Sequence, residues 1–214
     1  MKGRPSMATI QTQRLTLKPH GIKYLHSTHV YASDPESTVY MMHLPNSTIE
    51  ETAQFLRGVE EEWTAPNQRV YEYAIILDGT HIGAVSLYLD GACKVGELGW
   101  IINRAYHGYG YATEAANAVK GFAFSSDKFQ LEKIVAHCDY RNTPSIRVME
   151  KIGLTFERDD GMRRYKGSEE DIREIVYSLV VVSSHHGPSP SQAEPDSPLK
   201  VRGPKGNPQS AALT

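Results

Sequence analysis

Several segments of the chain have the apolar and polar pattern that is typical of β-strands. These segments are 14–18, 71–77, 81–89, 96–103, 133–140 and 172–182. Asp78 and Gly79 join the second segment to the third, so we expect a tight turn and a hairpin there. The last segment contains the run REIVYSLV, which also fits a helical period, so its pattern leaves strand and helix open.

Other segments place their apolar residues at helical spacing. They cover about 20–32, 49–63, 113–124 and 143–152. The run STIE, residues 47–50, matches a capping box at the start of the second helix. Thr143 followed by Pro144 is typical of a helix start, and Gly153 is typical of the position after a helix end. This order of elements predicts a mixed α/β (α+β) fold in which helices surround one sheet.

Residues 181–214 differ in composition from the rest of the chain. They hold half of its 12 prolines, no aromatic residue and, after the first valines, almost nothing apolar. Such a segment cannot offset the entropy that ordering would cost. We therefore expect a single folded domain over residues 8–182 and a disordered Pro/Ser-rich tail over 183–214.

Composition and charge narrow the possible functions of this 214-residue chain. The formal net charge of -2 does not favour nucleic acid as a partner. We expect no membrane contact, because the chain has neither an apolar run long enough to span a bilayer nor an apolar N-terminal signal segment. Two cysteines, Cys93 and Cys138, are too few for a disulfide framework, which indicates a cytoplasmic protein. No metal is expected, because the nine histidines show no metal-ligand spacing.

The run HGYGYA, residues 107–112, lies between an expected strand and an expected helix. A helix N-terminus carries free N–H groups and a partial positive charge, and glycine lets the backbone approach a ligand closely. Such a turn can hold a phosphate group. The run lacks the third glycine of a dinucleotide-binding fingerprint and the Gly-Lys pair of a Walker A loop.

Two motifs together resemble the GNAT N-acetyltransferases. Residues 107–112 are similar to the family's coenzyme A pyrophosphate loop, Q/R-x-x-G-x-G/A, with His107 in place of Gln or Arg. Residues 142–156 are similar to its N-x-x-S … E-K-x-G-F segment, with Leu154 in place of the usual Phe. The resemblance covers about residues 9–180, and the run GELGWIINRAYHGYGYATEA resembles the branch of ribosomal-protein alanine acetyltransferases. It implies a central twisted, mostly antiparallel sheet flanked by helices.

The resemblance implies that acetyl-CoA is the cosubstrate. Backbone N–H groups of the glycine turn would hold its pyrophosphate, and residues 98–102 would lie along its pantetheine arm. The residues expected to contact the cosubstrate are Ile101, Ile102, His107, Gly108, Tyr109, Gly110, Tyr111, Ala112, Thr113, Asn142 and Ser145.

The resemblance also implies direct attack of an amine, which needs a neutral amine and a proton for the leaving thiolate. Glu97, a carboxylate in the apolar strand GELGW, is the first candidate base; an ion pair with Arg or Lys of the next strand is its structural alternative. His137 is the second candidate. Ser145 is the candidate proton donor, because Met149 stands where many GNAT enzymes have a tyrosine. Helix capping is the structural alternative for Ser145.

The acceptor is expected to be a primary amine, either a protein N-terminus or a small molecule. The run Glu60 to Glu62 could attract a cationic amine or could simply form a solvated helix face. Candidates to line the acceptor groove are Tyr71, Glu72, Tyr73 and Tyr88. Two other functions stay open, namely a coenzyme A-binding sensor without transfer activity and a transferase of a longer acyl group. Monomer and homodimer are both open.

Overall fold

The structure, a computed structural model, describes residues 9–125 and 129–180. Its strands are β1 (Ile10–Gln11), β2 (Leu15–Pro19), β3 (Val70–Leu77), β4 (Thr80–Leu89), β5 (Val95–Ile102), β6 (Lys133–Asp139), β7 (Thr155–Arg164) and β8 (Asp171–Val180). Its helices are α1 (Leu25–Ala32), α2 (Pro35–Thr38), α3 (Ile49–Thr64), α4 (Tyr111–Ser125) and α5 (Thr143–Lys151), with short 3-10 helices η1 (Ile22–Tyr24) and η2 (Arg104–Tyr106). The expected tail, 183–214, lies outside these residues and stays a prediction.

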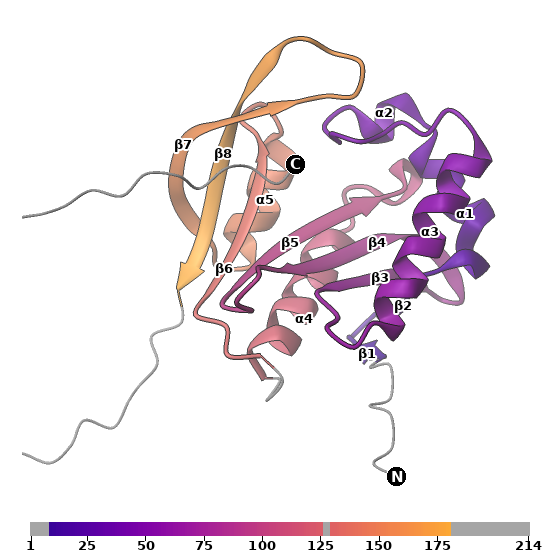
Figure 1. Ribbon diagram of the computed structural model, residues 1–214, viewed down its shortest axis with the longest axis horizontal. Coiled ribbons are helices and arrows are strands. Elements are labelled where there is room, and N and C mark those ends of the chain that lie inside the picture. Colours follow the sequence, from indigo (N-terminus) through magenta and orange to yellow (C-terminus); the bar gives the residue numbers. More distant parts are fainter. Residues whose placement is uncertain (1–8, 126–128, 181–214) are drawn as a thin grey trace, which may run out of the picture. The chain divides into compact units, whose positions relative to one another are not determined.

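The strands form one eight-stranded sheet in the order β1-β2-β3-β4-β5-β6-β8-β7 (Figure 1). Every neighbouring pair is antiparallel except β5 and β6. The predicted mixed α/β fold with a mostly antiparallel sheet is therefore confirmed. No helix of the described residues is long and apolar enough to span a membrane.

Helices cover the two faces of the sheet differently. Against one face, α4 packs its small buried residues on β4 and β5, and α5 contributes the fully buried Met149. The apolar core of the protein lies there, with Tyr71 and Tyr73 of β3 among its members. On the opposite face, α1 contacts β4 and α3 contacts β3. Alternate residues of each strand point to opposite faces, so neighbours of the core residues, such as Glu72, belong to this second face.

Local signals in the sequence account for most of the element ends. Asp78 and Gly79 have positive φ angles of 47° and 82°, as the predicted turn between β3 and β4 requires. Gly153 has φ 83° just after α5. Its N–H and that of Leu154 bond to the carbonyls of Glu150 and Met149, each at 3.0 Å, in a Schellman motif.

The cap residues inferred from the sequence for two helices are wrong by one residue. The N-cap of α3 is Thr48 rather than Ser47, because the Thr48 hydroxyl accepts from the N–H of Glu51 at 3.2 Å. The N-cap of α5 is Asn142 rather than Thr143, because the Asn142 Oδ1 accepts from the N–H of Ser145 at 3.2 Å. In both places two adjacent residues are of types that are favoured as N-caps, so residue type alone does not decide between them.

Strand β7 was not predicted from the sequence. It lies at the edge of the sheet and pairs only with β8, so its side chains are mostly exposed on both faces. A strand without a buried face has no apolar alternation to detect. The helical alternative for the last predicted segment, which contains REIVYSLV, is wrong. This segment forms β8, which pairs with both β6 and β7.

Candidate active site

Strands β5 and β6 diverge after a short parallel pairing. Their register pairs Val95 with Lys133, Gly96 with Ile134 and Glu97 with Val135, and it extends no further among the described residues. Figure 1 shows the two strands spreading apart, with β5 leading to α4 and β6 leading to α5. Glu97 therefore sits at the vertex of the divergence.

The divergence leaves backbone groups of β5 without a ladder partner on the β6 side. At one end of β5 the Val95 carbonyl accepts from the N–H of Asp90, just after β4, at 3.0 Å. Just past the other end the N–H of Asn103 donates to the carbonyl of Ile82 on β4 at 2.8 Å. Backbone direction alternates along an antiparallel strand, so Ile101 also faces β4. The backbone groups that face the divergence are those of Leu98, Trp100 and Ile102.

The turn before α4 has the open backbone that a ligand would need. Gly108 and Gly110 have φ angles of 86° and 81°, a region that side chains disfavour. No atom lies within 4 Å of the position that a Cβ of Gly108 would take. The first N–H groups of α4 have no partner within the helix. This geometry fits the pyrophosphate expected there.

Arg14 lies beside this turn, and its role was not predicted. Its guanidinium donates to Glu114 Oε2 at 2.6 Å and to the carbonyl of Tyr109 at 3.0 Å, and it stacks over the Tyr111 ring. It also lies 3.7 Å from the position of a Cβ on Gly110. Arg14 therefore braces the turn and adds positive charge. Because Arg14 and Glu114 are 100 residues apart, no local signal could have revealed the pair.

His107 has a structural role that the motif did not show. Its Nε2 lies 2.8 Å from the carbonyl oxygen of Ile102, to which it donates. The bond connects the turn to the end of β5. The carbonyl of Ile102 therefore already has a hydrogen-bond partner.

Glu97 lies in the predicted strand, and its side chain is exposed. Its register partners are Tyr88 on β4 and Val135 on β6, neither of which is basic. No ion pair to Glu97 is present among the described residues. The structural alternative, a cation on the next strand, is therefore not what the structure shows.

His137 belongs to an ion-pair network across β6, β8 and β7. Its Nδ1 lies 3.1 Å from Glu174 Oε1, and Arg163 donates to Glu174 Oε2 at 2.9 and 2.8 Å. The hydrogen bond to Glu174 raises the pKa of His137 above its ordinary value, with Glu97 adding to the effect. His137 and Glu97 therefore lie close enough to interact.

The start of α5 holds the remaining predicted residues. Asn142 caps the helix, because its Oδ1 accepts from the Ser145 N–H. Its amide NH₂ has no hydrogen-bond partner among the described residues, so it can donate to a ligand. Met149 is fully buried in the core, so it provides packing and no proton donor.

The acceptor-groove candidates divide between the two faces. Tyr71 and Tyr73 are buried in the core, so their assignment to a groove is wrong. Glu72 is also buried, at 6% exposure, but on the opposite face, where the Tyr88 hydroxyl donates to its Oε2 at 3.2 Å. Tyr88 is 39% exposed. Burial raises the pKa of Glu72 to about 7.

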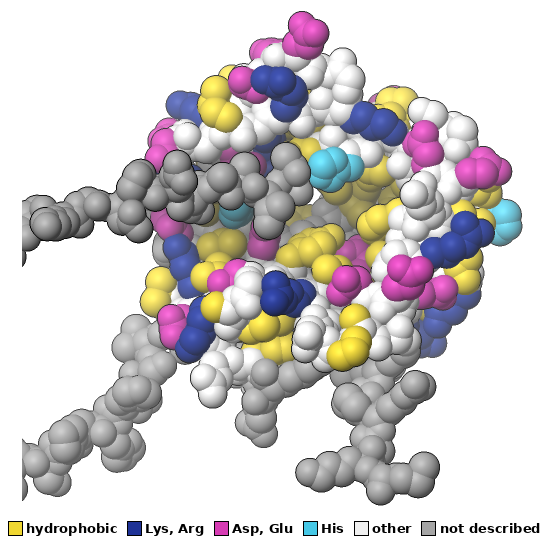
Figure 2. Space-filling model, viewed as in Figure 1, with side chains coloured by type: hydrophobic (Ala, Val, Ile, Leu, Met, Phe, Trp, Pro, Cys, Tyr) yellow, Lys and Arg dark blue, Asp and Glu magenta, His cyan; other side chains and the backbone are white. Residues whose placement is uncertain are grey.

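Tyr88 lines a groove of about 630 Å³, called the α3 groove below, formed by α3 with Val70, Tyr88 and Lys166. Figure 2 shows acidic side chains gathered over α3. Only Glu62 of the predicted acidic run lines the groove. Glu60 instead accepts from the N–H of Ile22 at 3.0 Å, so part of the run is structural.

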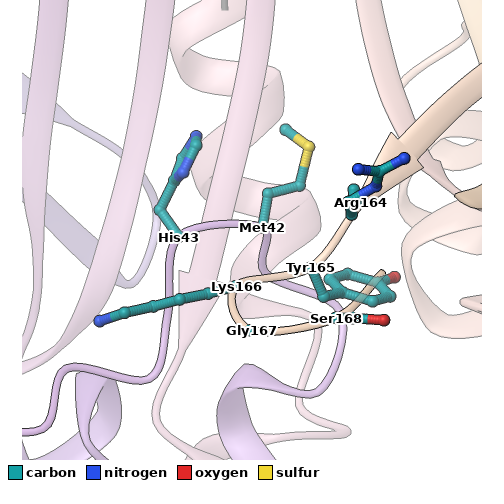
Figure 3. Close-up of a pocket in the computed structure, with 7 residues that line it drawn as sticks. All are labelled: Met42, His43, Arg164, Tyr165, Lys166, Gly167 and Ser168. Atoms are coloured by element: carbon teal, nitrogen blue, oxygen red, sulfur yellow. The ribbon is translucent and has the colours of Figure 1, made fainter. Parts of the chain in front are cut away.

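A second hollow, of about 510 Å³, lies between the loop after α2 and the β7–β8 loop (Figure 3). The N–H of Lys166 bonds to the carbonyl of Met42 at 2.9 Å and joins the two loops. In Figure 3 the side chain of Lys166 extends away from the hydroxyls of Tyr165 and Ser168. None of the site residues predicted from the sequence lines this hollow.

Comparisons with known proteins identify the family. The family model described as "Acetyltransferase (GNAT) domain" matches residues 14–155. The chain therefore belongs to the GNAT acetyltransferases and is an acetyl-CoA-dependent enzyme of that family, as predicted.

Individual relatives are consistent with this family assignment. N-acetyltransferase YnaD of Bacillus subtilis is 28% identical over 148 residues, which are 69% of this chain and 83% of YnaD. The crystal structure of a GNAT acetyltransferase from Bacillus anthracis is 30% identical, with a TM-score of 0.66 over 81% of this chain and 98% of that chain. The ribosomal L7/L12 acetyltransferase RimL, solved with coenzyme A, is 15% identical, with a TM-score of 0.70 over 81% of this chain and 98% of RimL, a likeness that shows the fold alone.

Proposed function

We propose that this protein transfers an acetyl group from acetyl-CoA to a primary amine, on a protein N-terminus or a small molecule, by direct attack. The observation that carries the proposal is the divergence of β5 and β6 beside the two-glycine turn of α4. Together they offer unpaired backbone donors and a helix N-terminus to one extended anionic ligand.

The cosubstrate would lie along β5 and end at α4. Backbone N–H groups from Gly108 to Thr113 would bind its pyrophosphate, with Arg14 adding positive charge. Strand geometry favours Leu98 and Trp100, rather than Ile101, as backbone partners of the pantetheine arm. The free amide of Asn142 would donate from the β6 side. Bound there, acetyl-CoA supplies an activated thioester.

Glu97 is the proposed base. It is exposed, it has no ion-pair partner among the described residues, and it lies where the strands diverge. An α-amine has a pKa of about 7.7–8.0, so a carboxylate acting through water can suffice. His137 is less suited, because the Glu174 bond raises its pKa and favours its protonated form. The Ser145 hydroxyl is the proposed proton donor to the leaving thiolate.

One observation favours a coenzyme A-binding sensor as the second candidate. The position where many GNAT enzymes carry a tyrosine is Met149, which is fully buried. If Ser145 cannot replace that tyrosine, binding would occur without transfer.

Calorimetric titration with acetyl-CoA, followed by thiol release against a panel of amines, tests both candidates. We expect saturable binding and amine-dependent thiol release, and the best amine would identify the acceptor class. Binding without release for any amine would favour the sensor. No binding would contradict both. A parallel panel of longer acyl-CoAs tests whether acetyl is the preferred group.

A further inference from the structure

Glu72 is a buried carboxylate without a cation. It is 6% exposed and forms no ion pair among the described residues. A buried carboxylate is costly unless it is paired or functional. On the same face, Glu174 has two partners, Arg163 and His137, which shows what a structural carboxylate looks like in this sheet.

Tyr88 connects Glu72 to the surface. Its hydroxyl donates to Glu72 Oε2 at 3.2 Å, and its exposed part lines the α3 groove. In the β4–β5 register Tyr88 lies directly opposite Glu97, so the two side chains are neighbours on one face. The three residues thus form a row that begins at the proposed base and ends at a carboxylate away from solvent.

The groups around Glu72 set its pKa close to neutral pH, so its carboxyl group can gain or lose a proton there. Burial raises the pKa of Glu72 to about 7, while hydrogen bonds from Tyr88 and Ser86 of β4 oppose this rise. From α1, the buried Tyr31 is close enough to interact with Glu72. The charge of Glu72 raises the pKa of Tyr88 above its ordinary range, with burial and Glu97 adding to the effect. Tyr88 is therefore suited to pass a proton on and not to remain ionised.

Resting on the proposed function, we propose that Glu72, acting through Tyr88, is the second proton acceptor of the reaction. An ammonium acceptor loses two protons as it becomes an amide, one before attack and one from the nitrogen afterwards. One proton goes to Glu97. The other passes to the Tyr88 oxygen while Tyr88 passes its own proton to Glu72 Oε2, which becomes a neutral carboxylic acid. The proton on Glu97 finally replaces the one that Ser145 gives to the leaving thiolate, and the proton on Glu72 returns through Tyr88 to water.

Kinetics of Glu72→Gln and Tyr88→Phe test the proposal. The wild-type kcat should rise with pH along a limb centred near pH 7. Both variants should lose this limb and about tenfold in kcat, with little change in the KM for acetyl-CoA. Glu132→Gln, an exposed glutamate paired with Lys94, is the matched control and should keep the limb. Retention of the limb in both variants would overturn the proposal.

A titration of the wild-type protein tests the proposal without a measurement of activity. Carboxyl-selective ¹³C NMR of the wild-type protein, assigned with Glu72→Gln, should show Glu72 titrating near pH 7. In Tyr88→Phe the midpoint should move higher, because a hydrogen bond to the carboxylate is lost. Titration near the ordinary glutamate value would overturn the proposal. Absence of wild-type thiol release with every amine would contradict the proposed function, whereas turnover with an unchanged limb in both variants would contradict this inference alone.

Discussion

Two parts of one sheet meet at the divergence of β5 and β6, and they differ in whether their charged groups form ion pairs. On the side of β6, β8 and β7, called the β6 side here, charged groups are paired. Glu174 binds both His137 and Arg163, and Asp139 accepts from Arg141 at 2.7 Å and from the Tyr165 hydroxyl at 2.7 Å.

On the side of β3, β4 and β5, called the β5 side here together with the turn that follows β5, groups that could bind or react have no ion-pair partner among the described residues. Gly108 has open space where a side chain would be, Glu97 is exposed without an ion-pair partner among the described residues, and Glu72 is buried with hydroxyl partners only. Breaking a buried ion pair destabilises a fold, and a buried carboxylate without a cation lowers stability but retains reactivity. The proposed base therefore lies on the β5 side, whereas the charged side chains of the β6 side are held in ion pairs.

The largest effect should come from Gly110→Asp on the β5 side. A carboxylate at the entrance of α4 would repel the pyrophosphate and occupy its space, so acetyl-CoA affinity should fall at least about a hundredfold. Calorimetric titration measures this. Gly153→Asp is the matched control, because its φ of 83° is close to the 81° of Gly110, and it should lose stability while keeping affinity. Equal affinity in Gly110→Asp and wild type would remove the turn as the phosphate site.

Glu174→Gln should show the structural role of the β6 side. It would leave the Arg163 side chain, 7% exposed, without its charge partner. The free energy of unfolding should fall by about 3 kcal/mol, measured by urea denaturation. The exposed pair Lys94–Glu132 provides the control, since Glu132→Gln should cost less than about 1 kcal/mol. Similar losses of unfolding free energy in the two variants would contradict the structural role proposed for the buried ion pair.

Glu72→Gln should stabilise the protein at alkaline pH. The folded-state pKa of about 7 lies above the ordinary 4.5, so the folded form binds the proton more tightly and the wild type loses stability as pH rises from 4.5 to 7. The neutral amide avoids this loss. At pH 8 the variant should gain about 3 kcal/mol, and the gain should vanish below about pH 4.5. Denaturation at several pH values measures it, and a pH-independent difference would contradict the assignment.

The smallest effect should come from Glu97→Gln. We expect about a tenfold fall in kcat, because an α-amine needs little help to lose its proton. The acetyl-CoA affinity and the melting temperature should not change, because the side chain is exposed. Rate measurements at several pH values check this. A kcat equal to that of the wild type throughout would exclude Glu97 as the base.

Short-range patterns were enough for the elements on either side of the two-glycine turn. The glycine pair, the strand before it and the helix after it are all within about 30 residues, and each is set by local backbone preference. The same patterns misplaced the N-cap residues of α3 and α5 by one residue, because adjacent polar residues compete for one cap. They missed β7, because an exposed edge strand has no buried face.

The sequence by itself determined the family, the single mixed α/β domain and the location of the two-glycine turn, because these depend on motifs and on hydrophobic periodicity. Only the tertiary structure decided which polar residues are paired. It placed His137 beside Glu174, Arg14 beside Glu114, and Glu72 under Tyr88. Such pairings join residues from different elements, and burial and partners set both pKa and reactivity, so no local pattern contains them.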